Sequence, residues 1–430
     1  MNTLARVNIW GQTAGVIAWN DARQSATFQF ENTFLKTGLD VSPLKMPLGQ
    51  AQNPNALFAF PELNPQTFHG LPGMLADSLP DKFGNALIDA WLARQGRRPE
   101  TFNPVERLCY TGKRGMGALE YEPVVAPFTD ASAPLDIKEL VQLVKDVFSE
   151  KAQLHTNIHE KPEEGLLDII RIGTSAGGAR AKAIIAYNKE TGDVRSGQID
   201  GLPGYEYWII KFDGATNQQL GDPKGYGRIE YAYHLMAKDC GMLLPECHLL
   251  QENGRAHFMT KRFDREGNKK LHMQSLCGMA HFDYNMAGLF SYEQAFQIMR
   301  QLGLPYTDAE EMYRRMIFNA IARNQDDHTK NISFLMNEAG QWQLSPAYDV
   351  TYAYDPANKW MHAHQMSING KREGITKADL TEVAKNMNIK KPNEIIEQVT
   401  DSVGHWTKFA KEAGIPAEQA KQIKNNLGLR

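Results

Sequence analysis

The feature that most constrains this chain is the segment between residues 323 and 354. It begins with a cluster of polar residues and continues through two apolar segments joined by a short turn. Asp326 is followed by Asn331, and two apolar segments joined by residues 337–340 then lead to Asp349. The turn reads Asn-Glu-Ala-Gly, and such a turn between apolar segments predicts a β-hairpin. The fold must therefore place a carboxylate and an amide before a hairpin, and a second carboxylate after it.

This spacing matches a known phosphoryl-transfer arrangement. In the protein-kinase catalytic loop, D-x-x-x-x-N, the Asp accepts the hydroxyl proton and the Asn holds magnesium, and Tyr348-Asp349-Val350 stands where kinases have D-F-G. Mg²⁺ prefers hard oxygen ligands, which Asn331 and Asp349 provide. Taken alone, the segment also fits a polar helix end followed by a surface hairpin. Asp327 rivals Asp326 as the base, and only the spacing to Asn331 favours Asp326.

A glycine-rich segment lies upstream, at residues 172–182, and its letters fit three chemistries. It contains G-x-S-x-G around Ser175, the nucleophile elbow of an α/β-hydrolase. It also contains half of a Walker A loop without the lysine, and it fits a glycine flap over nucleotide phosphates. The first two lead into helices, whereas the strand-like residues 183–187 and a turn at 188–192 follow here. This context favours the flap, although a tight turn without a ligand has the same composition.

Lys211 ends the apolar strand expected at residues 207–212. Burying a lysine is costly unless it meets anions, so this position suggests a phosphate-binding lysine. An exposed edge position is the alternative. Glu230 opens the helix expected at residues 228–240 and is a candidate partner for Lys211; an exposed glutamate at the helix end is the alternative, and position alone favours that alternative.

Composition bounds the remaining possibilities. The 430 residues include 47 Lys and Arg against 50 Asp and Glu, which gives a net charge of −3. Such a balance argues against binding nucleic acid through bulk charge. The four cysteines show no metal or disulfide spacing, and no apolar run reaches the length of a membrane span. We expect a cytoplasmic protein with no membrane contact.

The order of patterns predicts an α+β fold. Short alternating runs at 1–60 predict strands, a helix is expected at 80–94, and the Pro- and Ala-rich residues 123–136 suggest a linker. Further strands precede residue 262, and helices dominate after 290. We predict three parts: an N-terminal β-rich module (1–125), a kinase N-lobe with the glycine-rich loop (126–258) and a helical kinase C-lobe (259–430).

Several of these motifs together resemble the HipA-type serine/threonine kinases, the toxins of bacterial type II toxin–antitoxin pairs. The shared motifs are D-x-H-x-K-N at residues 326–331, Y-D-V at 348–350, G-A-x-x-K at 178–182, R-F-D at 262–264, and LPDKFG and GKRGMGAL in the N-terminal module. The resemblance runs over most of the chain. It implies a protein-kinase-like, two-lobed fold.

The resemblance also implies roles for individual residues, with ATP and Mg²⁺ as cofactors. Catalysis is assigned to Asp326, His328 and Lys330, and the metal to Asn331 and Asp349. Nucleotide contacts are assigned to Ser175, Ala176, Gly177, Gly178, Ala179, Lys211, Met259, Lys261, Phe263, His328 and Asn331. Lys261 stands where the family has an acidic hinge residue, so its expected contacts are through the backbone.

The resemblance further implies regulation and partners. Ser175 is the expected autophosphorylation site, and a phosphate there would add about −1.5 to −2 charges where ATP phosphates bind. The implied partner is a small helix-turn-helix, HipB-like antitoxin that makes most of any DNA contact. The implied substrate is a translation protein such as an aminoacyl-tRNA synthetase, which links the toxin to growth inhibition and persistence. A serine hydrolase using Ser175, or a non-catalytic pseudokinase binding module, are the alternatives.

Overall fold

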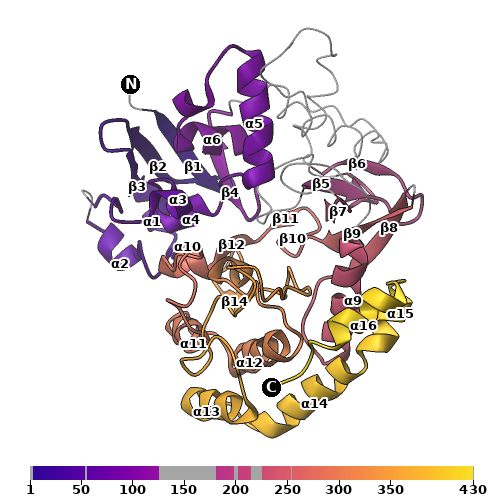
Figure 1. The fold of residues 1–430 in the computed structure, drawn as a ribbon. Coiled ribbons are helices and arrows are strands. Elements are labelled where there is room, and N and C mark those ends of the chain that lie inside the picture. The colour runs from indigo at the N-terminus through magenta and orange to yellow at the C-terminus, as the bar shows by residue number, and fades with distance from the viewer. Residues whose placement is uncertain are drawn as a thin grey trace.

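The computed structural model describes residues 3–53, 56–124, 181–197, 202–214, 225–252 and 254–429. In Figure 1 the N-terminal strands lie beside a second sheet, and the C-terminal helices lie below both. The glycine-rich segment before residue 181 and the linker predicted after residue 124 lie outside the described residues.

The N-terminal domain is built on an antiparallel sheet of order β3-β2-β1-β4. Its strands confirm the alternating pattern predicted for residues 1–60, because Val7, Ile9 and Ile17 are buried on one face. Asp81 caps the long helix predicted at residues 80–94 through a hydrogen bond from Gly84 N. The elements are β1 (Leu4–Ile9), β2 (Gln12–Asn20), β3 (Ser25–Phe30), α1 (Asn32–Leu35), α2 (Leu48–Ala51), α3 (Pro65–Phe68), α4 (Gly73–Ala76), α5 (Lys82–Arg94), the 3₁₀ turn η1 (Pro99–Thr101), α6 (Pro104–Thr111) and β4 (Leu119–Glu122).

A second antiparallel sheet, of order β6-β5-β7-β9-β8, follows. One helix packs against its β8 and β9 strands. This agrees with the predicted strands and helix in this part of the sequence. The elements are β5 (Lys182–Tyr187), β6 (Val194–Ser196), β7 (Glu206–Lys211), α9 (Tyr226–Asp239), β8 (Cys247–Glu252) and β9 (Arg255–Lys261).

The rest of the chain is mainly helical, as predicted. It opens with a two-stranded ribbon and a small sheet of order β12-β13-β14, whose β13–β14 pair is the hairpin predicted before Asp349. Thr376 and Asp379 form the predicted capping box of α13. The elements are β10 (Arg265–Glu266), β11 (Lys269–Lys270), β12 (His272–Ser275), α10 (Leu276–Ala280), α11 (Tyr292–Gln301), α12 (Tyr306–Ile321), η2 (Thr329–Asn331), β13 (Ser333–Met336), β14 (Trp342–Leu344), α13 (Lys377–Met387), α14 (Pro392–Gly404), α15 (Trp406–Glu412) and α16 (Ala417–Lys424).

The N-terminal domain is packed firmly against the helical part. Cys277 and Met336 belong to the hydrophobic core of the N-terminal domain, although they lie far along the chain. Buried polar groups join the same interface, since Asp77 accepts hydrogen bonds from the N–H and hydroxyl of Ser275 at 2.7 and 2.8 Å. Asp77 thus adds a carboxylate to the start of α10, which Ser275 caps.

The α+β fold with an N-terminal β-rich module and a mostly helical C-terminal part is confirmed. The three-part division of the chain stays a prediction, and its boundary at residue 258 falls within β9. All four cysteines are buried and unpaired. Among the described residues, every helix is too short or too polar to cross a membrane.

Candidate active site

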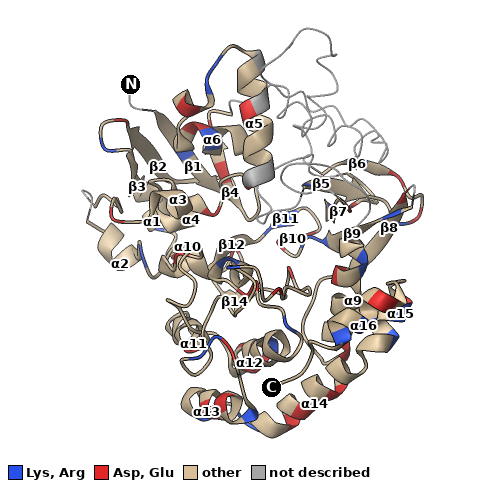
Figure 2. Ribbon diagram, in the orientation of Figure 1, with Lys and Arg blue, Asp and Glu red and all other residues tan. Residues whose placement is uncertain are grey.

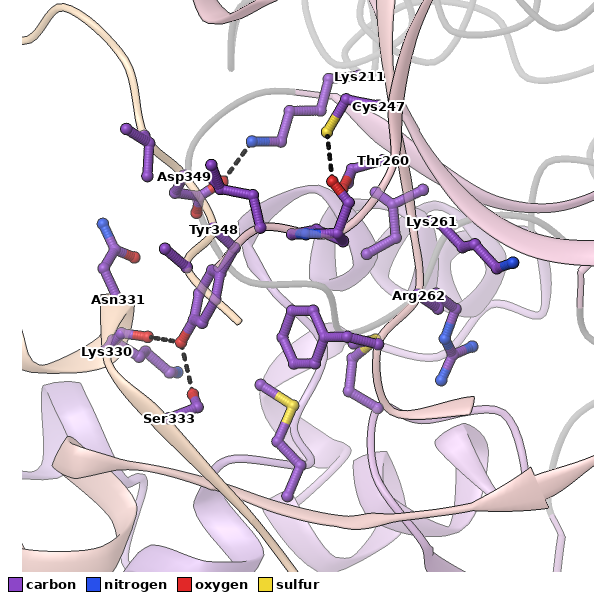
Figure 3. A pocket seen from close by; sticks show the side chains of 18 of the residues that line it. Lys211, Cys247, Thr260, Lys261, Arg262, Lys330, Asn331, Ser333, Tyr348 and Asp349 are labelled. Atoms are coloured by element: carbon purple, nitrogen blue, oxygen red, sulfur yellow. Dashed lines mark hydrogen bonds and ion pairs between the residues drawn. The ribbon is translucent and has the colours of Figure 1, made fainter. Parts of the chain in front are cut away.

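A pocket of about 1110 Å³, open solvent at its mouth included, lies between the five-stranded sheet and the helical part. Figure 3 shows its lining, with Lys211 and Asp349 on one side and Lys261 and Arg262 on the other. The five-stranded sheet, the β12-β13-β14 sheet, the segment of residues 326–331 and loops of the N-terminal domain contribute residues to it. The lining residues used below are Asp77, Met116, Lys211, Glu230, Lys261, Arg262, Phe263, Met273, His328, Lys330, Asn331, Tyr348 and Asp349.

Lys211 is the central cation of this pocket. Its Nζ lies 2.5 Å from Glu230 Oε1 and also contacts Asp349 Oδ1. Burial alone would lower the pKa of Lys211, but the carboxylates of Asp349 and Glu230 outweigh burial and raise that pKa above its ordinary value. The lysine therefore stays charged inside the pocket, and Glu230, a candidate partner from the sequence, is paired with it rather than exposed at the helix end.

Asp349 follows the hairpin in a strained backbone conformation. Its φ of 53° is left-handed, which is uncommon for a residue with a side chain and is found at functional sites. Burial tends to raise the pKa of Asp349, but Lys211 and Lys182 lower it to about 2. Tyr348 anchors this turn through its hydroxyl, which donates to Lys330 O at 2.7 Å and bonds Ser333 Oγ at 2.5 Å. The result is an ionised carboxylate held in place.

The catalytic-loop motif turns through η2 with Asp326 at its start. Asn331 Nδ2 donates to Asp326 O at 2.8 Å, which fixes the loop and the amide together. Trp360 Nε1 donates to Asp326 Oδ1 at 2.6 Å, and His328 Nε2 lies 3.7 Å from the same oxygen. The Asp326 side chain is 41% exposed, so its carboxylate can be reached from solvent.

Asp327 is placed differently. Its side chain is 1% exposed and accepts hydrogen bonds from Tyr292 Oη at 2.8 Å, His364 Nδ1 at 2.8 Å and Gln365 N at 2.7 Å. Burial would raise the pKa of Asp327, but His364 and these hydrogen bonds lower it. Both of its oxygens are used in holding the segment around residue 364 against the loop.

Lys330 extends from the catalytic loop towards the N-terminal domain. Its Nζ lies 5.5 Å from the centre of the Tyr284 ring, a cation–π arrangement. Burial lowers the pKa of Lys330, but Asp77 and other neighbours raise it above its ordinary value. Lys330 therefore keeps its charge beside Asp77, a residue of another domain.

The predicted hinge contacts are only partly arranged as expected. Lys261 and Phe263 line the pocket. Met259, in strand β9, is buried and does not line the pocket. The Lys261 N–H donates to Glu246 O at 2.8 Å, and the Lys261 side chain pairs with Glu206. Phe263 packs on Tyr348 with ring centres 5.5 Å apart.

A second lysine stands directly opposite Lys211. Lys182 pairs with Lys211 across β5 and β7, so both side chains lie on the same face of the sheet. Lys182 Nζ is 3.6 Å from Asp81 Oδ2 of the N-terminal domain, and both side chains are 4% exposed. Burial lowers the pKa of Lys182, while Asp81 and Asp349 act to raise it. Two lysines are therefore balanced by three carboxylates: Asp81, Glu230 and Asp349.

The structure brings several of the predicted site residues together. Lys211, His328, Lys330, Asn331 and Asp349 meet at one pocket. Asp326 lies beside His328 at its edge. The predicted residues Ser175, Ala176, Gly177, Gly178 and Ala179 lie outside the described residues.

Sequence reasoning missed other residues of the site. Asp77, Asp81 and Met116 come from the N-terminal domain, and Trp360 comes from a loop after the hairpin. The LPDKFG and GKRGMGAL motifs were the available signal for two of them, because Asp81 and Met116 lie in those motifs.

Comparison with curated proteins gives low-identity relatives. A Sinorhizobium fredii protein named "Putative kinase Y4mE" is 27% identical over 187 residues, and these cover 41% of this chain and 38% of the relative. A second protein of that organism, "Putative kinase Y4dM", is 29% identical over 162 residues, covering 33% and 36%. The chain thus spans less than two fifths of the length of these relatives.

A solved structure agrees over nearly the whole chain. HipA of Shewanella oneidensis MR-1, from a complex of HipA, HipB and operator DNA, superposes with a TM-score of 0.67 at 17% identity, covering 98% of this chain and 94% of that one. At this identity the match shows the fold. The family model for the HipA N-terminal domain matches residues 5–122, and that for the HipA-like C-terminal domain matches residues 174–427. Because the second model alone matches more than half of the sequence, the chain belongs to the HipA family.

Proposed function

We propose that this protein is a serine/threonine protein kinase that transfers the γ-phosphoryl group of Mg-ATP to a protein hydroxyl. The observation that carries the proposal is the buried Lys211–Glu230–Asp349 cluster, with Asn331 and Asp326 beside it. Phosphoryl transfer requires charge neutralisation and positioning more than covalent help from the protein, and these groups supply both.

The donor set fits magnesium bound together with a nucleotide. Among the described residues no cluster of three or more His, Cys, Asp or Glu side chains could hold a metal by itself. Mg²⁺ commonly takes one or two protein oxygens and completes its shell with water and phosphate oxygens. Asp349, ionised with its pKa near 2, and the amide oxygen of Asn331 would hold the ion. The ion would neutralise phosphate charge.

The chain's own groups then have separate tasks. Lys211 would bind phosphate oxygens, and Glu230 would keep Lys211 extended into the pocket. Asp326 would accept the proton of the substrate hydroxyl, because its carboxylate is exposed while that of Asp327 is buried and fully used. His328 Nε2, near the same oxygen, would help to hold that carboxylate in place.

The hydrolase alternative receives less support. A nucleophile elbow leads directly into a helix, whereas the first described element after the glycine-rich segment is the strand β5. The pseudokinase alternative predicts damaged phosphate- or metal-binding positions. Lys211, Asn331 and Asp349 are all present and lie at one pocket.

The biological role belongs to the same proposal. A HipA in the solved complex assembles with HipB and operator DNA, and we propose a small HipB-like, helix-turn-helix antitoxin as partner here. Figure 2 shows Lys and Arg interspersed with Asp and Glu over both domains. With a net charge of −3, the chain would leave most DNA contact to that partner. Growth inhibition through a translation protein, such as an aminoacyl-tRNA synthetase, completes the proposal.

The test is transfer of label from γ-labelled Mg-ATP to protein, compared among the wild type, Asp326→Asn, Asp349→Asn and Ser175→Ala. Kinase chemistry predicts loss of transfer to substrate in both Asp variants and its retention in Ser175→Ala. A hydrolase predicts no phosphotransfer by any form, and esterase activity that disappears in Ser175→Ala. We also expect Ser175→Asp to weaken ATP binding, because its charge would repel the phosphates. Unchanged ATP affinity in that variant would refute self-inhibition at Ser175.

A further inference from the structure

The N-terminal domain, which lies outside the lobes that the proposed kinase chemistry uses, contributes an apolar residue to the pocket. Met116 belongs to the loop of the N-terminal domain between α6 and β4, yet it lines the same pocket as Lys211 and Asp349. The loop that carries Met116 belongs to a domain with its own hydrophobic core. Met116 can line the pocket in a fixed position only if contacts hold this loop against the rest of the protein.

Hydrogen bonds to residues 262–265, the hinge segment that follows β9, hold this loop on both sides of Met116. Before it, Gly115 O accepts from Arg262 Nη2 at 3.1 Å. After it, Gly117 N donates to Asp264 Oδ2 at 2.8 Å, and Gly117 O accepts from Arg265 Nη1 at 3.1 Å. The residues on either side of Met116 are therefore bonded to the segment that follows β9.

The bonding groups of the hinge are themselves buried and rigid. Arg262 is 2% exposed and Asp264 is fully buried, and Arg262 donates twice to Asp264, at 2.9 and 2.6 Å. Such a bidentate pair has a fixed geometry. Burial acts to raise the pKa of Asp264, but Arg262 and Arg265 lower it to about 2, so the carboxylate stays ionised.

Close packing also limits the loop. Gly117 has a φ of 79°, and a Cβ there would lie 3.1 Å from Met273 N and 3.3 Å from Met273 Cβ. A side chain at residue 117 would be strained at this φ and would require Met273 to move by a few tenths of an ångström, so the position favours glycine. The loop therefore lies directly against β12, and Met273, another lining residue, lies beside it.

The end of the pocket reached by Met116 is the one away from the phosphate-binding groups. Lys211, Asn331 and Asp349 gather on one side, and Lys261 and Arg262 lie across the pocket from them (Figure 3). Phe263, Met273 and Met116 provide apolar lining beside that hinge. A planar, weakly polar base is the part of a nucleotide that suits such a surface, and a thioether adapts well to an aromatic face.

We propose that Met116 is a specificity-determining residue of the nucleotide pocket, supplied by the N-terminal domain, whose side chain forms part of the wall that receives the base. This inference rests on the proposed kinase function, since it takes the ligand to be a nucleoside triphosphate. The N-terminal domain then contributes directly to nucleotide binding.

The experiment measures binding to the full-length protein by calorimetry, with two probes: a non-hydrolysable ATP analogue with Mg²⁺, and inorganic tripolyphosphate with Mg²⁺. Met116→Ala should weaken binding of the analogue about tenfold, which corresponds to ~1.4 kcal/mol, because an apolar contact with the base is lost. Tripolyphosphate has no base, so its affinity should stay unchanged. Met116→Leu, which keeps an apolar side chain of similar volume, should bind the analogue with an affinity within about twofold of the wild type.

Two further variants complete the test. Met286→Ala removes an exposed methionine that is not among the lining residues, and should bind both probes as the wild type does. Should Met116→Ala fail to fold, Met116→Gln, of the same length with a polar end, takes its place with the same expected pattern.

The possible results separate the two proposals. Equal analogue affinity in wild type and Met116→Ala, or an equal loss for both probes, overturns the role of Met116 and leaves the kinase proposal intact. A wild-type protein that binds neither probe overturns the proposed function, and the inference about Met116 falls with it.

Discussion

Two adjacent carboxylates are both candidates for the base, and the structure predicts opposite consequences for replacing them. Asp327 is buried and accepts three hydrogen bonds, whereas the Asp326 side chain is 41% exposed and accepts a hydrogen bond from Trp360. Asp327→Ala leaves Tyr292, His364 and a backbone N–H as buried donors without an acceptor. Each buried group left without its hydrogen-bond partner costs about 1–3 kcal/mol, so the three together should cost at least about 3 kcal/mol.

That loss is a large part of the stability of a folded protein, which totals about 5–15 kcal/mol. At about 2–4 °C per kcal/mol for a unit of this size, the thermal midpoint of Asp327→Ala should fall by about 10 °C or more. Asp326→Asn keeps an oxygen that accepts from Trp360 Nε1 in an exposed position. It should therefore change stability by less than about 1 kcal/mol.

Activity should show the reverse order. A general base contributes about 10²–10⁴-fold to a rate, so Asp326→Asn should lose at least about 100-fold in transfer of label from γ-labelled Mg-ATP. Asp327→Asn, measured well below its own melting temperature, should lose less than Asp326→Asn. Thermal unfolding and phosphotransfer are measured on the same preparations. A stable Asp327→Asn without activity, beside an active Asp326→Asn, would refute the assignment and make Asp327 the base.

Three other predictions test the phosphate end and the domain contact. Lys211→Met should reduce phosphotransfer at least about 100-fold, and Glu230→Gln, which only positions Lys211, should reduce it less; equal losses would contradict that ranking. Removing Mg²⁺ with EDTA should weaken binding of the ATP analogue to the wild type. The affinity of Asp349→Asn for the analogue should depend much less on Mg²⁺. The pKa of Asp264 is about 2 in the folded protein and about 3.9 when unfolded. The resulting stability is present above pH 3.9 and is lost as the pH falls towards 2, so acid unfolding of Asp264→Asn should start from a lower stability and fall less steeply over that range.

The elements that the sequence predicted correctly depend on local patterns. Strands β1, β2 and β3 follow from alternation, and the β13–β14 hairpin follows from a four-residue turn between apolar segments. Lys211, Asn331 and Asp349 could be chosen as candidates because their motifs have the order and spacing found in protein kinases. The structure brings the three residues to one pocket.

Other contacts could not be predicted because they join segments far apart in the chain. Gly115, next to Met116, and Arg262 are hydrogen-bonded although they lie 147 positions apart, and no period or motif spacing links them. The preference for Asp326 over Asp327 depended on spacing alone, whereas burial now separates the two residues. The sequence predicted a contact between Met259 and the nucleotide from its position near the hinge. In the structure Met259 lies on the face of β9 away from the pocket, because alternate residues of a strand face opposite sides.

The charges of the pocket are arranged so that a nearly neutral chain would accommodate the proposed nucleotide. Lys211 lies between Glu230 and Asp349, Lys182 lies beside Asp81, and Lys330 lies near Asp77. Each of these lysines stays buried because a carboxylate offsets the cost of desolvating it. A triphosphate alone must compete with those carboxylates for Lys211. A divalent cation on Asp349 would remove one competitor and neutralise phosphate charge, so nucleotide and metal should each strengthen binding of the other. Because Asp77 and Asp81 come from the N-terminal domain, this balance of charge depends on both domains being docked.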